Sequence, residues 1–256
     1  MSWDLAAGLE GRAVLVTGAA GGIGRAVARA FAAANARVAA VDLTQVGVDA
    51  VIADLGGDAR HVAFAADLRD PMVPDALVQR VCGALGRLDV LAHVAAVIVR
   101  RADVEDVELE DWALQDEVNL RATFLLNRAA ARAMRRQGEG GRIMNFSSQG
   151  WWTGGYGGSI VYSATKGGVV SMTRGLARTY APDGVLVNCV SPGAVDTPML
   201  HDGMSDEALD AFRAQIPLAR FANPDELAGA VVFLASKHAS YITGATLNVS
   251  GGQLMY

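Results

Sequence analysis

The stretch Ala13–Gly24 reads AVLVTGAAGGIG, a short apolar run that passes directly into a turn containing four glycines. An amphipathic segment with helical spacing continues to Asn35. Where a parallel strand turns into a helix, backbone N–H groups and the positive end of the helix dipole face outward, and a pyrophosphate reaches them only if side chains are missing. A tight turn also favours glycine for purely structural reasons, so the turn alone leaves both interpretations open. The residues that we expect to hold a phosphate are Gly18, Gly22, Ile23 and Gly24.

Apolar β-rich runs alternate with longer amphipathic segments along the whole chain, a pattern typical of repeated βαβ units around a parallel sheet. No Pro/Gly/Ser-rich linker and no repeat divides the sequence, so we expect one domain over residues 1–256. The predicted fold class is therefore α/β, a doubly wound parallel sheet of seven strands with helices on both faces. The expected strands are 13–17, 37–42, 61–65, 88–95, 142–147, 185–190 and 246–249, and the expected helices are 24–35, 74–85, 110–137, 162–180, 206–215 and 224–236.

Composition narrows the class of partner. Hydrophobic residues make up 52% of the chain and charged residues 19%, which excludes a disordered protein. The net charge of −5 gives no electrostatic reason to bind nucleic acid or an anionic membrane. The longest apolar stretch, Val90–Val99, is too short to span a bilayer, and the N-terminus lacks an export signal, so we expect a cytoplasmic protein. Cys82 and Cys189 are expected to be inert core thiols, and we expect no metal site.

A second signal supports a nucleotide at the glycine turn. Asp42 ends the second expected strand, where an acidic side chain accepts both ribose hydroxyls of an adenosine and repels a 2′-phosphate. This favours NAD over NADP. Asp67, followed by Leu68, comes just after the third strand and is predicted either to lie near the adenine or to cap the next helix.

Tyr162 and Lys166 are four residues apart at the start of an expected helix, which places the phenol and the ammonium on one face. Ser148 follows a buried strand, at the carboxyl edge where open α/β sheets bind ligands. Asn119 lies in an apolar helical stretch, where a buried amide must find partners. We therefore expect Asn119 to be either a structural bracket or part of a proton relay.

These residues carry a resemblance to the short-chain dehydrogenase/reductase family, in the branch whose chains are about as long as this one. The resemblance extends over essentially the whole sequence and also includes the stretches 191–197, 216–221, 226–228, 233–236 and 242–252. It implies a Rossmann-type sheet in the order 3-2-1-4-5-6-7 and, usually, a homotetramer. Together with Asp42 it favours an NAD-dependent oxidoreductase acting on a small-molecule alcohol or ketone.

The resemblance also implies roles for individual residues. Tyr162 is expected to act as general acid/base, Lys166 to bind the nicotinamide ribose and lower the pKa of Tyr162, Ser148 to polarise the substrate oxygen, and Asn119 to hold a relay water. Further cofactor contacts are expected from Ala95, Pro192, Gly193, Val195 and Thr197.

The chain departs from the family pattern after the fourth strand. His93-Val94-Ala95-Ala96 replaces the usual Asn-Asn-Ala-Gly, and Ala96 adds a methyl group where backbone and cofactor approach closely. His93 itself is interpreted as a core residue with satisfied nitrogens rather than as a catalytic imidazole.

Two segments of the sequence are expected to contact the substrate. Trp151 and Trp152 lie between the serine and tyrosine elements and either pack down or line the mouth of a pocket. Residues 196–216 resemble the family's substrate lid, with Met199 and Met204 as expected substrate contacts. No Arg or Lys occurs in 149–160 or 196–206, which favours a medium-sized, mainly uncharged secondary alcohol or ketone, cyclic or aromatic. Trp112 is expected in the core.

Two alternatives to a dehydrogenase remain open. Epimerases and dehydratases of the same fold keep a Tyr and Lys pair but tend to carry an additional sugar-nucleotide subdomain, for which this chain has little room. A non-catalytic dinucleotide sensor is the other alternative, and such proteins commonly lose the Tyr or the Lys.

Overall fold

A seven-stranded sheet in the order β3-β2-β1-β4-β5-β6-β7 forms the centre of the computed structural model, which describes residues 4–155 and 157–255. All neighbouring strands are parallel, and the predicted order is confirmed. β1 is buried along its whole length, as expected for a central strand covered on both faces. The strands are β1 (Ala13–Thr17), β2 (Arg37–Asp42), β3 (Val62–Ala65), β4 (Val90–His93), β5 (Gly141–Phe146), β6 (Val185–Pro192) and β7 (Thr246–Val249).

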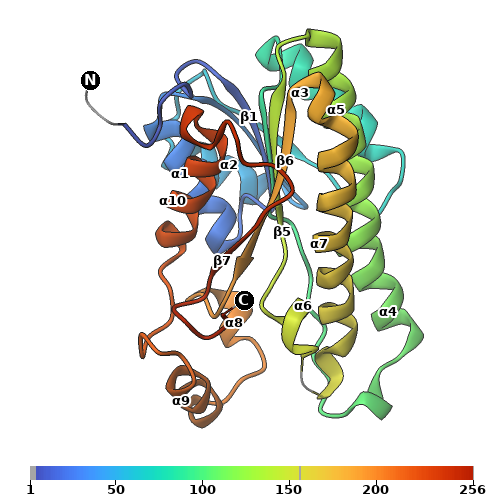
Figure 1. Ribbon diagram of the computed structural model, residues 1–256. Helices are drawn as coiled ribbons and strands as arrows, with labels where there is room; N and C mark the ends of the chain where they lie inside the picture. The colour runs from blue at the N-terminus through green and yellow to red at the C-terminus, as the bar shows by residue number, and fades with distance from the viewer. Residues whose placement is uncertain (1–3, 156, 256) are drawn as a thin grey trace.

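Helices cover both faces of this sheet (Figure 1). One face packs against α1 (Gly22–Ala33), α2 (Gln45–Asp54) and α10 (Pro224–Ala235). The other packs against α3 (Val73–Leu85), α5 (Ala122–Gln137) and α7 (Ile160–Tyr180). Alternate side chains of each strand enter one core or the other: Val14 and Val16 of β1 belong to the first, Ala13 and Leu15 to the second.

Shorter helices gather at the carboxyl edge of the sheet, where β5 and β6 end. They are α6 (Gly150–Thr153), α8 (Pro198–His201) and α9 (Asp206–Ala214), drawn below the sheet in Figure 1. The predicted lid, residues 196–216, contains α8 and α9. Its apolar side chains form a small core of their own, made of Leu200, Leu209 and Ile216 with Ala194.

The structure differs from the sequence-based expectation in two helical regions. The helix expected over 110–137 is interrupted: α4 (Leu109–Gln115) ends in a π-helical stretch, η2 (Asp116–Arg121), before α5 begins. Helix α2 was not expected, although Thr44 caps it by accepting a hydrogen bond from the Gly47 N–H at 3.2 Å. The remaining elements are the 3₁₀ turns η1 (Val104–Asp106), η3 (Gly157–Ser159), η4 (Ala181–Asp183) and η5 (Lys237–Ala239).

Candidate active site

The glycine turn fits closely against the segment that follows β4. Gly18 has a φ of +67°, and a Cβ atom placed there would lie 2.7 Å from the backbone nitrogen of Ala95. A Cβ on Gly24 would collide with the carbonyl oxygen of Gly18. The absence of side chains is therefore what allows the turn to form directly before α1, whose first N–H groups have no partner within the helix.

The turn also touches the beginning of the predicted lid. A Cβ on Gly22 would lie 2.6 Å from the Thr197 methyl carbon, and one on Gly193 would lie 2.8 Å from Cα of Ser250. Val195 pairs with Ala222 in an isolated parallel bridge, and Pro192 ends β6. The cofactor residues predicted after β6 thus lie at the same edge as the glycine turn, in a tightly packed backbone.

Asp42 is anchored beside the turn by its own carboxylate. Its two oxygens accept the Ala20 N–H at 2.9 Å and the Leu43 N–H at 2.8 Å. A carboxylate has about four lone-pair sites, so capacity remains for ribose hydroxyls. The residues present therefore fit an adenosine dinucleotide at this edge.

Asp67 does not cap the next helix, because α3 begins at Val73 with Met72 as its N-cap. The carboxylate of Asp67 instead pairs with Arg69 at 2.6 Å, and hydrogen bonds from Arg69 lower the pKa of that carboxyl. The side chain of Leu68 is buried in the core, so a nucleotide contact would come from its backbone. An adenine contact by Asp67 stays a prediction.

Ser148, Tyr162 and Lys166 are brought together by β5 and α7. The Lys166 Nζ lies 5.5 Å from the centroid of the Tyr162 ring and donates a hydrogen bond to the Phe146 carbonyl at 2.9 Å. Ser147 donates its hydroxyl proton to the Lys166 carbonyl at 2.9 Å and so braces α7. The hydroxyl of Ser148, in contrast, forms a hydrogen bond with the side chain of Tyr162.

The surroundings of these groups shift their proton affinities. Burial raises the pKa of Tyr162 to about 12, while the hydrogen bond with Ser148 and the positive charge of Arg100 act to lower this pKa. Burial lowers the pKa of Lys166 to about 8, because the charged form loses hydration. Lys166 is therefore less basic than an exposed lysine.

Asn119 brackets the chain that leaves β4. Its Oδ1 accepts the Val97 N–H, and its Nδ2 donates to the Val97 carbonyl, both at 2.8 Å. The π-helical stretch η2 holds this fully buried amide, and such stretches are common at functional sites. The structure thus realises the bracket interpretation, and the relay role stays a prediction.

The bracket is one of three contacts along the helix axis, each four residues from the next. Gln115 Oε1 accepts the Val99 N–H at 3.1 Å. Asp111 accepts two hydrogen bonds from Arg101, at 2.7 and 2.8 Å. The segment 97–101 is therefore fixed at alternate residues to one face of α4 and η2, an arrangement that we call the α4 strap.

His93 lies in the core with both ring nitrogens hydrogen-bonded. Nδ1 is 2.7 Å from Thr17 Oγ1, and Nε2 is 3.0 Å from Thr123 Oγ1. Because Thr123 donates its own proton to the Asn119 carbonyl at 2.6 Å, we assign the neutral tautomer with hydrogen on Nε2. Burial lowers the pKa of His93 to about 3, in agreement with a structural role.

The two tryptophans of the loop after Ser148 behave differently. Trp151 packs against Val169, Val170 and Cys189 beneath α7, whereas Trp152 is 58% exposed. In the predicted lid, Met204 packs against the lid's own core and Met199 is 43% exposed. Trp152, whose ring meets that of Trp151 edge-on at 5.3 Å, and Met199 are thus the more exposed members of these two pairs. Trp112 is 53% exposed, so its expected place in the core is wrong.

Arg100 is the charged group near the site that sequence reasoning missed. It comes from the segment after β4 and donates to two carbonyls of the predicted lid, those of Met199 at 3.0 Å and Asp202 at 3.2 Å. The sequence pattern points to the loops after β5 and β6 as the substrate segments, and neither loop contains an Arg or Lys in 149–160 or 196–206. Because β4 and β5 are neighbours in the sheet, the loop after β4 reaches the same edge.

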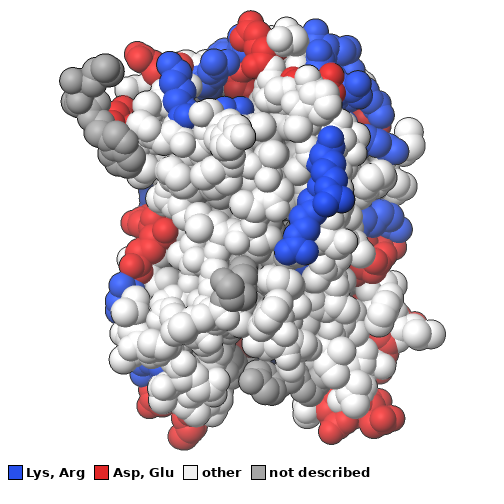
Figure 2. Space-filling model, viewed as in Figure 1, with Lys and Arg blue, Asp and Glu red and all other residues white. Residues whose placement is uncertain are grey.

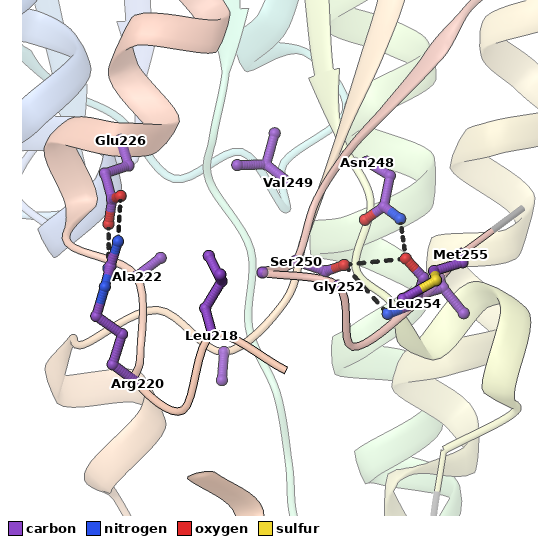
Figure 3. A pocket seen from close by; sticks show the side chains of 12 residues that line it. Leu218, Arg220, Ala222, Glu226, Asn248, Val249, Ser250, Gly252, Leu254 and Met255 are labelled. Carbon is purple, nitrogen blue, oxygen red and sulfur yellow. Dashed lines mark hydrogen bonds and ion pairs between the residues drawn. The ribbon is translucent and has the colours of Figure 1, made fainter. Parts of the chain in front are cut away.

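A separate cavity of about 410 Å³ lies beyond the end of β7. Figure 3 shows the ion pair of Arg220 with Glu226 on one side of it and, on the other, Ser250 hydrogen-bonded to Leu254. None of Ser148, Tyr162 and Lys166 lines this cavity. It is distinct from the site assembled by β5 and α7.

Three further observations bear on the expected ligands and cysteine chemistry. Within residues 4–155 and 157–255, no cluster of His, Cys, Asp or Glu suited to a metal ion occurs. No helix in that part of the chain is long and apolar enough to cross a bilayer. Cys189 is buried and Cys82 half-buried, both are free thiols, and burial raises the pKa of Cys82 and that of Cys189, the latter to about 12. These raised pKa values agree with inert thiols.

A doubly wound parallel sheet with a glycine turn after its first strand, and with polar side chains at the carboxyl ends of its strands, defines the class of Rossmann-type proteins. Residues 18–253 match the family model described as Enoyl-(Acyl carrier protein) reductase. The chain belongs to the short-chain dehydrogenase/reductase family, and it is an oxidoreductase of the kind that generally uses NAD or NADP.

Relatives support this assignment over nearly the whole chain. D-threitol dehydrogenase of Mycolicibacterium smegmatis is 42% identical over 253 residues, covering 98% of this chain and 96% of that protein. The 3-oxoacyl-[acyl-carrier-protein] reductase FabG of Escherichia coli is 36% identical, covering 96% and 98%. The crystal structure of a putative short-chain alcohol dehydrogenase from Sinorhizobium meliloti is 34% identical with a TM-score of 0.92, covering 98% of both chains.

Proposed function

We propose that this chain is an NAD-dependent oxidoreductase that interconverts a secondary alcohol and a ketone by hydride transfer, with Tyr162 as general acid/base. The observation that carries the proposal is the joint placement of Tyr162, Lys166 and Ser148. A phenol, an ammonium and a hydroxyl meet at the carboxyl edge of the sheet, beside a turn suited to a pyrophosphate. The two alternatives are less well supported: a sensor would not need both Tyr162 and Lys166, and an epimerase tends to carry an additional subdomain.

In this proposal the side chains of the protein carry out the proton transfer. The nicotinamide, when bound, accepts or supplies the hydride and in its oxidised form adds positive charge near the site. Tyr162 takes the hydroxyl proton of the alcohol, and the positive charges of Lys166 and Arg100 favour its phenolate. The hydroxyl of Ser148 stabilises the developing alkoxide. The remaining N–H bonds of Lys166, beyond the one given to Phe146, bind the nicotinamide ribose.

NAD is proposed over NADP because of Asp42. Its carboxylate is held at the end of β2, beside the Ala20 N–H of the glycine turn. A 2′-phosphate placed there would face this negative charge, whereas two ribose hydroxyls would donate to it.

The proposed substrate is medium-sized and mainly apolar, cyclic or aromatic. Exposed Trp152 and Met199 support this proposal. Two of the four apolar residues expected to contact the substrate do not support it, because Met204 and Trp151 pack within the protein.

Turnover tests the proposal directly. Wild type would be assayed by absorbance of the reduced nicotinamide with NAD and a panel of cyclic and aromatic secondary alcohols, D-threitol and a 3-hydroxyacyl thioester. Tyr162→Phe is expected to lower kcat by about 10² to 10⁴, with the Kd for NAD nearly unchanged. Full activity of Tyr162→Phe would refute the acid/base assignment, and absence of turnover in wild type across the panel would refute the substrate class.

A homotetramer is proposed as the working form. Large apolar side chains remain exposed on α4 and α5, namely Leu109, Trp112 and Phe124. Figure 2 shows a broad face over β7 and α7 that is mostly uncharged, with one stripe of basic side chains over α7. Both features suit contact with further copies of the chain.

A further inference from the structure

Arg100 connects two regions that are far apart in the sequence. Its backbone belongs to the segment that leaves β4, and its guanidinium donates to carbonyls at the end of α8, in the predicted lid. The last carbonyls of any helix lack intrahelical partners. A guanidinium is well suited to satisfy two of them at once, because its donors form a rigid fork.

The direction of the Arg100 side chain follows from the α4 strap. Four helical residues advance about 6 Å along the axis, and two extended residues advance about 6.6 Å. Asn119, Gln115 and Asp111 therefore match Val97, Val99 and Arg101 in turn when the segment runs antiparallel to the helix. At the end of the strap the Arg101 side chain is held by Asp111, whereas the guanidinium of its neighbour Arg100 reaches the carbonyls of Met199 and Asp202 in the lid.

We propose that Arg100 is a positioning residue that holds the lid, residues 196–216, closed across the mouth of the Tyr162 site. The proposal deepens the dehydrogenase function proposed above and rests on it for its effect on catalysis, whereas the effect on the lid itself does not depend on turnover. The α4 strap supplies the fixed end of this latch, and the carbonyls of Met199 and Asp202 supply its moving end.

The positive charge of the same guanidinium also acts to lower the pKa of Tyr162. The charged groups near Tyr162 are Lys166 on its own helix and Arg100 from the segment after β4. On the lid, His201 and Asp196 pair with each other at 2.7 Å. Loss of the Arg100 charge therefore disfavours the phenolate form of Tyr162, in addition to releasing the lid.

Hydrogen exchange of the intact cofactor-free protein tests the latch without any substrate. In Arg100→Met, amides of 196–216 are expected to exchange about tenfold faster than in wild type. Arg100→Lys keeps the charge but loses the fork, so its lid exchange should be intermediate. Arg178→Met, which removes an exposed arginine from the last turn of α7, serves as the matched control and should exchange like wild type.

Kinetics then separate positioning from a merely structural role. Arg100→Met is expected to raise KM for the alcohol about tenfold and to move the rise of kcat/KM with pH to higher pH, whereas Arg100→Lys should keep the wild-type pH profile. Unchanged lid exchange in Arg100→Met would overturn the proposal. Faster lid exchange in Arg100→Met, combined with a wild-type protein that turns over none of the panel, would keep the latch and remove only its catalytic role.

Discussion

At Asp42, one carboxylate both supports the glycine turn and faces the expected ribose. Asp42→Ala is therefore expected to weaken NAD binding and to relax the preference for NAD over NADP by about tenfold or more, because the negative charge is lost. Asp42→Asn keeps an acceptor for the Ala20 N–H and removes the charge together with the acceptor for the Leu43 N–H. The measurement is the ratio of kcat/KM for the two cofactors.

The two variants distinguish charge from geometry. If both relax the preference to a similar degree, charge decides it. An unchanged ratio in both variants would show that residues other than Asp42 select the cofactor.

His93 gives the fold an acid-sensitive component. Its pKa is about 3 in the folded protein against an ordinary 6.5, so between these values the unfolded chain binds more protons. Stability therefore falls as pH decreases below 6.5. Between pH 7 and pH 5, wild type is expected to lose about 2 kcal/mol more than His93→Gln, measured by urea unfolding.

A matched control for His93 is available at the surface. His238 is exposed and contacts the Asp4 carbonyl, so His238→Gln, measured beside His93→Gln, controls for the loss of one histidine as such. Parallel pH curves for wild type and His93→Gln would contradict the assignment of a buried neutral imidazole.

Single residues could be predicted from the sequence where local spacing determines their geometry. Tyr162 and Lys166 share a helix face because they are four residues apart, and the structure brings them together with Ser148. Arg100 was missed because its proximity to the lid is a property of sheet order, which joins the loops after β4, β5 and β6 at one edge. Local sequence spacing contains no information on that contact.

At the scale of elements, the α4 strap depends on its middle contact. Gln115→Ala would leave the Val99 N–H without its buried acceptor, at an expected cost of about 1–3 kcal/mol in the free energy of unfolding. The loosened segment should also raise KM for the alcohol and speed lid exchange, because Arg100 loses its fixed direction. Urea unfolding and hydrogen exchange measure the two effects.

Gln137 offers the matched control for this prediction. Its side-chain amide pairs with both the N–H and the carbonyl of Leu88, just before β4, at 2.8 Å. Gln137→Ala should destabilise the fold to a similar extent while leaving KM and lid exchange unchanged. Equal effects of both variants on the lid would mean that destabilisation, rather than the strap, moves it.

Each end of every predicted strand lies within two residues of the observed end, because buried parallel strands are continuous apolar runs. Helix α2 escaped prediction because its apolar residues do not follow one stripe and it contains Gly47. The π-helical stretch within 110–137 could not be predicted, since its helical periodicity shifts by about one residue only where tertiary contacts hold Asn119.

At the scale of the whole molecule, a prediction concerns assembly. Sedimentation is expected to give four times the chain mass of 26.7 kDa. Trp112→Ser, which replaces an exposed indole on α4, should shift the protein toward smaller species because apolar contact area is lost. Met72→Ser is the control, because it alters an exposed side chain next to α3 and should leave the mass of the assembly unchanged. Phe64 is unsuitable for this purpose because it packs against the core. A monomeric wild type would refute the proposed tetramer.

Gly22 and Thr197 meet with no room for an intervening side chain, although one begins α1 and the other caps α8. The proposed dinucleotide site and the first residues of the predicted substrate lid are therefore in direct contact. In the proposed complex, a pyrophosphate bound at the N-terminus of α1 would also hold in place the first residues of the predicted lid. We therefore expect a compulsory order of addition, in which the dinucleotide arrives first and the alcohol is enclosed second.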